Sequence, residues 1–241
     1  MNLIADIGNT LIKTAVFSGN EIIFEQQSAG IESSLLENLV RTFPLKNAII
    51  SSVSSDPANY LDILKNKLDF ILLPDHNTPI PISNLYLSPE TLGFDRLASA
   101  VGAHVHFPHS NLLIIDAGTA ITIDFISESG EFKGGNISPG IDMRFKALKT
   151  FTNNLPLVDR NGDIQLTGKT TEEAIRSGVM NGIFYELDGY IKSYFEKYDN
   201  LKVILTGGDY KYFEKKLKNT IFVDSNLTLK GLQQILEYNV K

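Results

Sequence analysis

Cysteine is absent from this chain of 241 residues. Disulfide bonds, a catalytic thiol and thiolate metal sites are therefore excluded. Long hydrophobic runs are also missing, because no segment approaches the roughly 18 to 20 apolar residues of a membrane-spanning helix. Positive charge is in deficit, since 22 lysine and arginine residues stand against 28 acidic residues and give a formal net charge of −6. This balance argues against broad electrostatic binding to nucleic acid or to an anionic membrane.

Two common nucleotide-binding motifs are missing as well. The chain has no G-x-x-x-x-G-K-[ST] sequence, so it is not a P-loop enzyme, and no G-x-G-x-x-G opens a helix after a strand. Its four histidines lack metal-ligand spacing. The first residues are apolar, but Asp6 interrupts them and no basic start or small-residue cleavage site accompanies them. We therefore expect no signal peptide and a cytoplasmic protein with neither membrane nor nucleic acid as partner.

An internal repeat is the most informative feature that is present. The segment Ile4–Thr10 (IADIGNT) resembles Ile114–Ala120 (IIDAGTA), and an apolar run of β type follows each copy. The copies are 116 − 6 = 110 residues apart, which is the length of a domain. Strand-like and helix-like segments alternate in both halves, as is typical of α/β proteins. We predict an α/β chain of two duplicated domains, residues 1–108 and 109–241.

The longest predicted helix runs from about Glu172 to Glu196. Its core-facing residues recur at helical spacing, and they are Ile175, Val179, Ile183, Leu187, Ile191 and Tyr194. Thr170 and Glu173 have the spacing of a capping box at the start of this helix. On local grounds, the neighbouring Thr171 fits a structural role as well as it fits ligand binding.

Both Asp-x-Gly turns have chemistry that suits a phosphate group. A glycine after a strand-end aspartate allows positive φ and close approach of backbone amides to an anionic oxygen. Asn9, Thr10 and Thr119 can donate hydrogen bonds to phosphate. The aspartate itself repels phosphate, so we expect it to hold a bridging cation. One such turn is also ordinary hairpin chemistry, and only the repetition at domain spacing favours function.

Three other segments could belong to the same site. Lys13 could neutralise a phosphate as a point charge, although hairpin lysines are usually solvated. Gly207 and Gly208 follow an apolar strand and would allow close approach of a ligand, or would serve packing alone. Asp95 and Arg96 open a predicted helix, where simple capping is one explanation. Alternatively, Asp95 could take the proton of a substrate hydroxyl during phosphoryl transfer, and Arg96 could clamp a carboxylate.

Taken together, these segments resemble the type III pantothenate kinases, which belong to the superfamily of acetate and sugar kinases, Hsp70 and actin. The similarity covers nearly the whole chain. The motifs that carry it are Asp6–Thr10 with Lys13, Tyr86–Arg96, Asp116–Ala120, Gly134–Gly140, Gly168–Glu172 and Leu205–Gly208. The Asp-x-Gly turns are shared by the superfamily, whereas the block from Tyr86 to Arg96 and the loop from Gly134 to Gly140 are much more specific.

The resemblance implies an actin-like ATPase fold of two duplicated ribonuclease-H-like domains, with the active site in the cleft between them. It also implies ATP-dependent phosphorylation of the primary hydroxyl of pantothenate to 4'-phosphopantothenate, the first step of coenzyme A biosynthesis. Transfer would be direct and in line, without a covalent intermediate. The implied cofactors are Mg²⁺ and a monovalent cation, K⁺ or NH₄⁺, and the implied assembly is a homodimer.

The resemblance also implies the residues of the site. For ATP they are Asp6, Ile7, Gly8, Asn9, Thr10, Leu11, Ile12, Lys13 and Thr119. For pantothenate they are Tyr86, Gly93, Phe94, Asp95, Arg96 and Thr171, with Asp95 as the catalytic base. For metals they are Asp6, which would hold Mg²⁺ through water, and Asp116, which would hold K⁺.

Other functions remain open from the sequence. A catalytically inactive regulatory or binding protein could keep the same fold, although intact Asp6, Asp95 and Asp116 argue against it. A two-metal nuclease would need converging carboxylates and a basic surface for nucleic acid. The acidic net charge of the chain disfavours such a surface. A kinase of another small hydroxyl compound, such as a sugar, is the closest alternative among enzymes, and the Tyr86–Arg96 block distinguishes it.

Overall fold

The computed structural model describes residues 1–30, 33–52, 58–217 and 221–240. The chain divides into two compact units. The first unit consists of Met1–His109, Ile126–Gly134 and Asn226–Lys241, and the second consists of Ser110–Phe125 and Gly135–Ser225. The chain first passes between the units next to the predicted boundary at 108/109. Two segments from the second half of the sequence belong with the first unit, which the sequence did not indicate.

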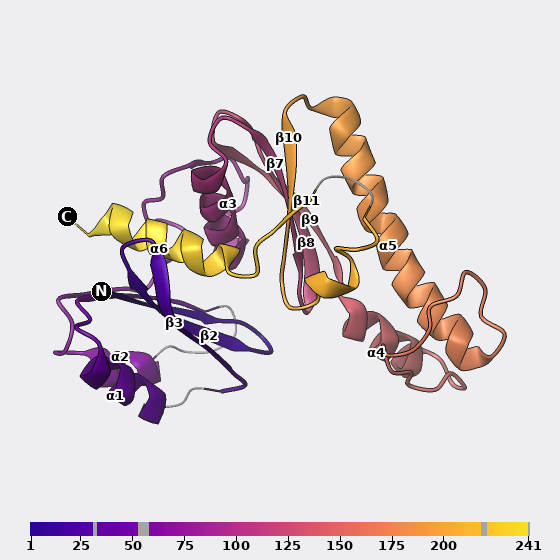
Figure 1. The fold of residues 1–241 in the computed structure, drawn as a ribbon, viewed down its shortest axis with the longest axis horizontal. Coiled ribbons are helices and arrows are strands. Elements are labelled where there is room, and N and C mark those ends of the chain that lie inside the picture. Colours follow the sequence, from indigo (N-terminus) through magenta and orange to yellow (C-terminus); the bar gives the residue numbers. More distant parts are fainter. Residues whose placement is uncertain (31–32, 53–57, 218–220, 241) are drawn as a thin grey trace. The chain divides into compact units, whose positions relative to one another are not determined.

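A five-stranded sheet forms the centre of the first unit (Figure 1). Its strands are β1 (Asn2–Ile7), β2 (Ile12–Ser18), β3 (Glu21–Ser28), β4 (Asn47–Ser52) and β5 (Phe70–Leu72), in the order β3-β2-β1-β4-β5. β1 is antiparallel to β2 and parallel to β4. Because side chains alternate along a strand, Leu3, Ala5 and Ile7 enter one core. Helices α1 (Ser33–Thr42) and α2 (Ala58–Leu64) contribute Leu36, Leu39, Tyr60 and Leu64 to the same core.

Two helices pack on the opposite face of this sheet. They are α3 (Phe94–His106) and α6 (Leu227–Asn239), and Asn2 of β1 donates a hydrogen bond of 3.1 Å to Gln233 Oε1 of α6. The two helices meet through glycine. A Cβ atom on Gly231 would lie only 1.7 Å from the carbonyl oxygen of Ala98. The unit also contains the short 3₁₀ helix η1 (Pro89–Thr91) and the strand β6 (Ser83–Asn84), which pairs with Glu131 and Phe132.

The second sheet repeats the topology of the first. Its strands are β7 (Asn111–Ala117), β8 (Ala120–Ile126), β9 (Glu131–Pro139), β10 (Leu201–Thr206) and β11 (Ile221–Val223), with β6 beyond β9. The order β9-β8-β7-β10-β11 corresponds strand for strand to β3-β2-β1-β4-β5. β10 is parallel to both β7 and β11. The repeat in the sequence therefore is a repeat of chain topology, with each Asp-x-Gly turn after the central strand.

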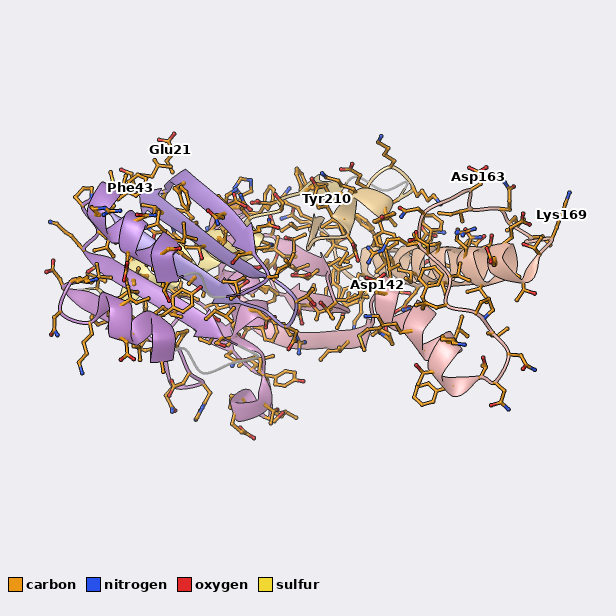
Figure 2. The ribbon with its side chains drawn as sticks, turned by 90° about the horizontal axis from the view of Figure 1, so that it is seen from below. Glu21, Phe43, Asp142, Asp163, Lys169 and Tyr210 are labelled. Atoms are coloured by element: carbon orange, nitrogen blue, oxygen red, sulfur yellow. The ribbon has the colours of Figure 1, made fainter. Side chains whose placement is uncertain are left out.

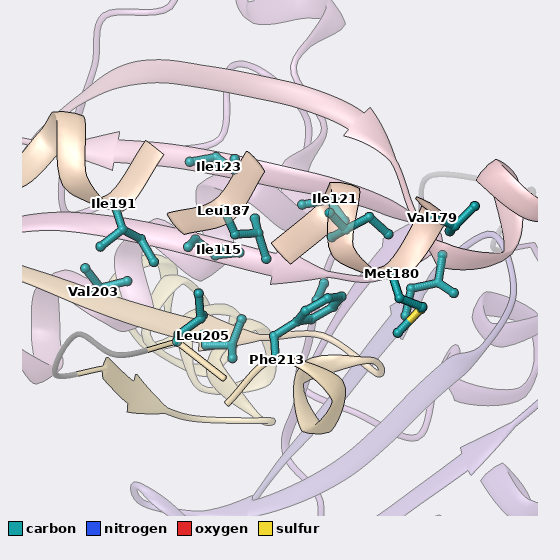
Figure 3. Packing of buried hydrophobic residues seen from close by; sticks show 14 of the residues in the cluster. Ile115, Ile121, Ile123, Val179, Met180, Leu187, Ile191, Val203, Leu205 and Phe213 are labelled. Atoms are coloured by element: carbon teal, nitrogen blue, oxygen red, sulfur yellow. The ribbon is translucent and has the colours of Figure 1, made fainter. Parts of the chain in front are cut away.

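The core of the second unit lies between its sheet and two helices, α4 (Ile141–Phe151) and α5 (Thr171–Lys197). Figure 3 shows Ile115 and Ile123 of the sheet beside Leu187 and Ile191 of α5. The predicted helix is confirmed: its expected apolar residues are buried, except Tyr194, which is partly buried against the same cluster. The 3₁₀ helix η2 (Tyr210–Tyr212) follows β10. Across the described ranges, none of the helices combines the length and the apolar character needed to span a bilayer.

Candidate active site

The two Asp-x-Gly turns differ in length. Four residues, from Gly8 to Leu11, join β1 to β2, and the N–H of Gly8 donates to the carbonyl oxygen of Leu11 at 3.1 Å. Only Gly118 and Thr119 join β7 to β8, and the N–H of Gly118 donates to the carbonyl oxygen of Ala120 at 3.2 Å. The longer first turn leaves Asn9, Thr10 and Leu11 exposed. The two copies are therefore not equivalent, and the first offers more groups to a ligand.

Neither glycine of these turns has the positive φ that the sequence allowed for. Glycine is needed at both positions because a side chain would collide with neighbouring atoms of the turn. A Cβ atom on Gly8 would lie 3.0 Å from the carbonyl oxygen of Leu11, and one on Gly118 would lie 3.0 Å from Asp116 Oδ1. The absence of a side chain thus lets each turn close tightly after its aspartate.

Asp6 and Lys13 lie opposite each other in the register of β1 and β2. Directly paired residues of neighbouring strands project to the same face of the sheet, so the carboxylate and the ammonium group share one surface. Ile7 and Ile12, which the resemblance assigned to ATP, are 1% and 6% exposed and belong to the core. Only their backbone groups are therefore available to a ligand.

Ser51 lies beside Asp6 on the other side, because β4 pairs with β1 in parallel at this position. Ser51 is not among the residues predicted from the sequence. Ser51 is 1% exposed, and within the described ranges its hydroxyl has no hydrogen-bond partner. Buried polar groups are usually satisfied by protein, water or a ligand. The sequence carries no signal for this residue, since a serine near a strand end is common.

Asp116 lies at the end of the central strand of the second sheet, next to Thr206 of β10. The loop after β10 packs closely on it. Gly207 has φ +89°, and a Cβ atom there would lie 2.5 Å from Asp116 Oδ1. The backbone N–H of Asp209 donates to the carbonyl oxygen of Ala117 at 2.8 Å. The glycines after β10 thus allow a loop to lie directly against the aspartate that the resemblance assigned to K⁺.

A second glycine loop supports the same turn. The N–H of Gly140 donates to the carbonyl oxygen of Thr119 at 3.1 Å. A Cβ atom on Gly140 would lie 2.4 Å from the carbonyl oxygens of both Gly118 and Thr119. Arg144 holds this loop through a hydrogen bond of 2.8 Å from Nε to the carbonyl oxygen of Pro139. Thr119 itself is exposed beyond these contacts.

Metal ions at Asp6 or Asp116 would find few protein carboxylates. In the described part of the chain, no group of three or more histidine, aspartate or glutamate side chains could enclose a metal ion. This arrangement fits Mg²⁺ at Asp6, because Mg²⁺ typically keeps several waters and binds one or two carboxylates plus substrate phosphates. A monovalent cation at Asp116 would need backbone or ligand oxygens, and the carbonyl oxygens of the turn are close by.

Asp95 lies in the first turn of α3, and its carboxylate folds back over the helix start. Asp95 Oδ1 accepts a hydrogen bond of 2.9 Å from the backbone N–H of Arg96. Burial raises the pKa of the Asp95 carboxyl, and the N–H and the charge of Arg96 only partly offset this effect. A Cβ atom on Gly93 would lie 2.5 Å from Oδ1, so the glycine is needed for this geometry. A raised pKa suits a carboxylate that accepts a proton.

Arg96 is 7% exposed, and its guanidinium lies near two neighbouring aromatic rings. Its Cζ atom is 5.6 Å from the ring centroid of Tyr86 and 6.0 Å from that of Phe132. Gly134, with φ +105°, permits Tyr86 to approach, because a Cβ atom there would lie 3.2 Å from Tyr86 Cδ2. The structure thus brings the predicted residues Tyr86 and Arg96 together. Phe132 was missed, because one phenylalanine in an apolar strand has no distinguishing signal.

Phe94 and Thr171 have contrasting environments. Phe94 is 8% exposed, so its side chain belongs to the core. Thr171 is exposed at the start of α5 in the second unit. The predicted cap of α5 is present in part: Thr170 Oγ1 accepts from the N–H of Glu173 at 3.2 Å. The Glu173 carboxylate instead accepts from the N–H of Lys169 at 2.8 Å. Thr171 takes no part in this cap, and its role toward pantothenate stays a prediction.

Comparisons with solved structures identify the fold. A Campylobacter jejuni protein whose structure is named for the Baf family of transcriptional activators is 23% identical, with a TM-score of 0.63 and 98% coverage of both chains. A Sinorhizobium meliloti protein named for 2-dehydro-3-deoxygalactonokinase is 13% identical, with a TM-score of 0.55 and 99% coverage of both chains. At these identities the likeness shows the fold alone. Together with the repeated sheet topology, it confirms the predicted two-domain fold of sugar kinases and actin-like ATPases.

Comparisons with sequences identify the family. A family model described as type III pantothenate kinase matches residues 2–193. A protein of Azobacteroides pseudotrichonymphae named type III pantothenate kinase is 46% identical over 241 residues, and the alignment covers 100% of this chain and 98% of that protein. The family model ends before β10, whereas the alignment with this relative spans the whole chain. The chain therefore belongs to the type III pantothenate kinase family.

Proposed function

We propose that this protein transfers the γ-phosphoryl group of ATP to the primary hydroxyl of pantothenate, the first step of coenzyme A biosynthesis. The observation that carries the proposal is the 46% identity over the whole chain with a relative named for this activity. The alternatives of an inactive protein or a kinase of another hydroxyl compound are not favoured by these relatives. The local geometry agrees with the proposal, because a carboxylate of raised pKa and a buried arginine occupy successive positions at the start of α3.

The first unit would hold the phosphates. Backbone N–H groups and side chains of the exposed segment Asn9–Leu11 would face the phosphate oxygens, and Asp6 would hold Mg²⁺ through water. Lys13 lies opposite Asp6 and would offset negative charge that develops on the transferred group. Bound Mg²⁺ would neutralise charge on the phosphates during transfer. Ile7 and Ile12 would contribute backbone groups only, because their side chains are buried.

The second unit would supply Thr119 and Asp116. Thr119 is exposed at the tip of the short turn, where its hydroxyl could bond to ATP. Asp116, together with nearby backbone carbonyl oxygens such as that of Ala117, would hold K⁺ or NH₄⁺. The close approach of Gly207 to Asp116 supports placing the nucleotide beside the loop after β10.

Pantothenate would bind at the start of α3. Asp95 would orient the primary hydroxyl and accept its proton as the phosphorus–oxygen bond forms in line with the departing ADP. Arg96, which lies near the rings of Tyr86 and Phe132, would bind the carboxylate of pantothenate through its planar guanidinium. Gly93 leaves room for the Asp95 carboxylate, and the backbones of Gly93 and Phe94 would line the site. Thr171 would complete the contacts to pantothenate.

We further propose a cytoplasmic homodimer. Large apolar side chains are exposed on α4, on the loop after it and on α5, among them Phe151 at 85% and Leu166 at 81%. Apolar side chains exposed in this number often mark an interface. A second copy of the chain would cover them, and sedimentation velocity at micromolar concentration would detect the dimer.

One experiment tests the proposed reaction. The purified protein would be incubated with ATP, Mg²⁺, K⁺ and pantothenate, in parallel with sugars, and phosphorylated products would be identified by mass spectrometry. We expect 4'-phosphopantothenate and no sugar phosphate. Absence of phosphopantothenate under every cation condition would refute the proposal. Na⁺ in place of K⁺ should lower the rate, and an unchanged rate would argue against a monovalent-cation site at Asp116.

A further inference from the structure

A long loop between α4 and α5 is tied to the rest of the second unit at defined points. It covers residues 152–170, and Asp163 and Lys169 mark it in Figure 2. Loops of this length without secondary structure are uncommon in compact domains and are often functional. Side chains of α5 hold it at two points: Arg176 Nε donates to the carbonyl oxygen of Asp159 at 3.0 Å, and Asn181 Nδ2 donates to that of Gln165 at 2.8 Å.

Arg160 ties the same loop to two other elements. Its Nε donates to Oδ1 of Asp142, in the first turn of α4, at 3.0 Å, and its Nη2 also pairs with this carboxylate. Its Nη1 donates to Oδ1 of Asp209 at 2.6 Å. The Cζ atom lies 5.6 Å from the ring centroid of Tyr212. One guanidinium therefore joins the loop, α4 and the segment after β10.

The cluster pairs one guanidinium with two carboxylates, and the contact between Arg160 and Asp209 is partly shielded from water. The side chains of Arg160 and Asp209 are only 21% and 20% exposed. Burial raises the pKa of Asp209, and the charge and hydrogen bond of Arg160 oppose this rise. Burial alone would lower the pKa of Arg160, but its bonds to Asp142 and Asp209 outweigh burial and raise it. Without the guanidinium, two carboxylates would face one another and Asp209 would be left partly buried and unpaired.

Asp209 has a second attachment, to the strand that carries Asp116. Its backbone N–H donates to the carbonyl oxygen of Ala117 at 2.8 Å, and its own carbonyl oxygen accepts from the N–H of Tyr212 at 3.1 Å. Gly207, two residues earlier, is packed against Asp116 Oδ1. The short segment Gly207–Asp209 is therefore held by the end of β7 through its backbone and by Arg160 through its side chain.

We propose that Arg160 is a positioning residue for the nucleotide, which through Asp209 holds the Gly207–Gly208 backbone in place beside Asp116. The inference rests on the proposed function, in which ATP lies beside this loop. The Arg160 guanidinium contacts Asp142, Asp209 and Tyr212. It therefore acts on the nucleotide indirectly, through the segment Gly207–Asp209. The sequence gives no sign of this role, because Arg160 and Asp209 are 49 positions apart.

The test compares Arg160→Gln and Arg160→Lys with a matched control, Arg176→Gln. The control loosens the same loop at Asp159 but does not touch Asp209. We expect Arg160→Gln to raise the KM for ATP roughly tenfold while the KM for pantothenate changes less than about twofold. Arg160→Lys should recover part of the loss, because lysine keeps the charge but lacks the fork that pairs with two carboxylates. Arg176→Gln should leave the KM for ATP within about twofold of wild type.

Binding of ADP, measured by isothermal titration calorimetry, and urea unfolding separate positioning from stability. We expect Arg160→Gln to bind ADP more weakly by a similar factor. A variant that unfolds more easily but binds ADP and ATP as wild type does would overturn the proposal, as would an equal rise in both KM values. If Arg160→Gln does not fold, Asp209→Asn must show the same selective loss for ATP. If wild type binds ADP, with the expected loss in Arg160→Gln, but does not phosphorylate pantothenate, the proposed function fails and the positioning role stands.

Discussion

Lys13 lies directly opposite Asp6 across β1 and β2, so a cation and an anion emerge together beside the first Asp-x-Gly turn. If this pair serves the phosphates, Lys13→Ala should lower kcat by roughly 10²-fold, because a preorganised positive charge stabilises charge that develops during transfer. Steady-state kinetics with ATP and pantothenate would measure the effect. Lys65→Ala, a change of an exposed lysine of the same unit, is the control and should retain wild-type kcat. Equal rates for all three proteins would show that Lys13 is an ordinary hairpin lysine.

Asp95→Asn should remove activity while it preserves the helix start. The amide oxygen of asparagine can still accept from the N–H of Arg96, but asparagine cannot take a proton, so kcat should fall roughly 10²- to 10⁴-fold. In the wild type, kcat/KM should decline as pH falls through the raised pKa of Asp95, because only the ionised form is a base. Full turnover by Asp95→Asn would exclude Asp95 as the base.

The same pKa shift has a consequence for stability. The folded-state pKa of Asp95 is raised because the buried carboxylate is costly to ionise, so its protonated form is favoured by folding. This favourable contribution is complete below the unfolded-state pKa and is lost as pH rises through the raised folded-state pKa. Asp95→Asn should therefore be more stable than wild type at pH 7, and the difference should shrink toward pH 4. Urea unfolding across this range measures it, and a constant difference would contradict the shift.

Several parts of the architecture were predictable because they follow from periodicity and repetition. The apolar spacing of α5 predicted its buried residues, and the two Asp-x-Gly segments indicated two duplicated domains, which the structure shows as two sheets of the same strand order. Local sequence could not reveal that the two turns differ by two residues in length, because either one residue after the glycine, Thr119, or three, Asn9–Leu11, can complete a hairpin turn. Phe132 beside Arg96 and Arg160 beside Asp209 depend on tertiary contacts between distant residues. No local pattern encodes such contacts.

Gly140→Ala should selectively damage the second turn. A methyl group at this position would overlap the carbonyl oxygens of Gly118 and Thr119, so the turn or the loop must move. Because small displacements of positioned groups are costly for catalysis, we expect kcat/KM for ATP to fall roughly 10²-fold. Gly178→Ala is the control: it meets nothing within 4 Å in α5, so it should leave kinetics unchanged and stabilise the helix by up to about 1 kcal/mol. Wild-type kinetics in Gly140→Ala would show that the loop around Gly140 can shift without displacing the turn at Gly118 and Thr119.

Gly231→Ala should weaken the first unit through the contact between α3 and α6. A Cβ atom at this position would lie 1.7 Å from the carbonyl oxygen of Ala98, and the opposing atoms are backbone that cannot rotate away. Overpacking of this kind should lower the free energy of unfolding by about 3 kcal/mol, measured by urea denaturation. Gly189→Ala, also helical but in open space on α5, should be neutral or stabilising. Since α3 carries Asp95 and Arg96, a folded Gly231→Ala protein should also show a raised KM for pantothenate. A variant as stable as wild type would show that the two helices are not packed through these glycines.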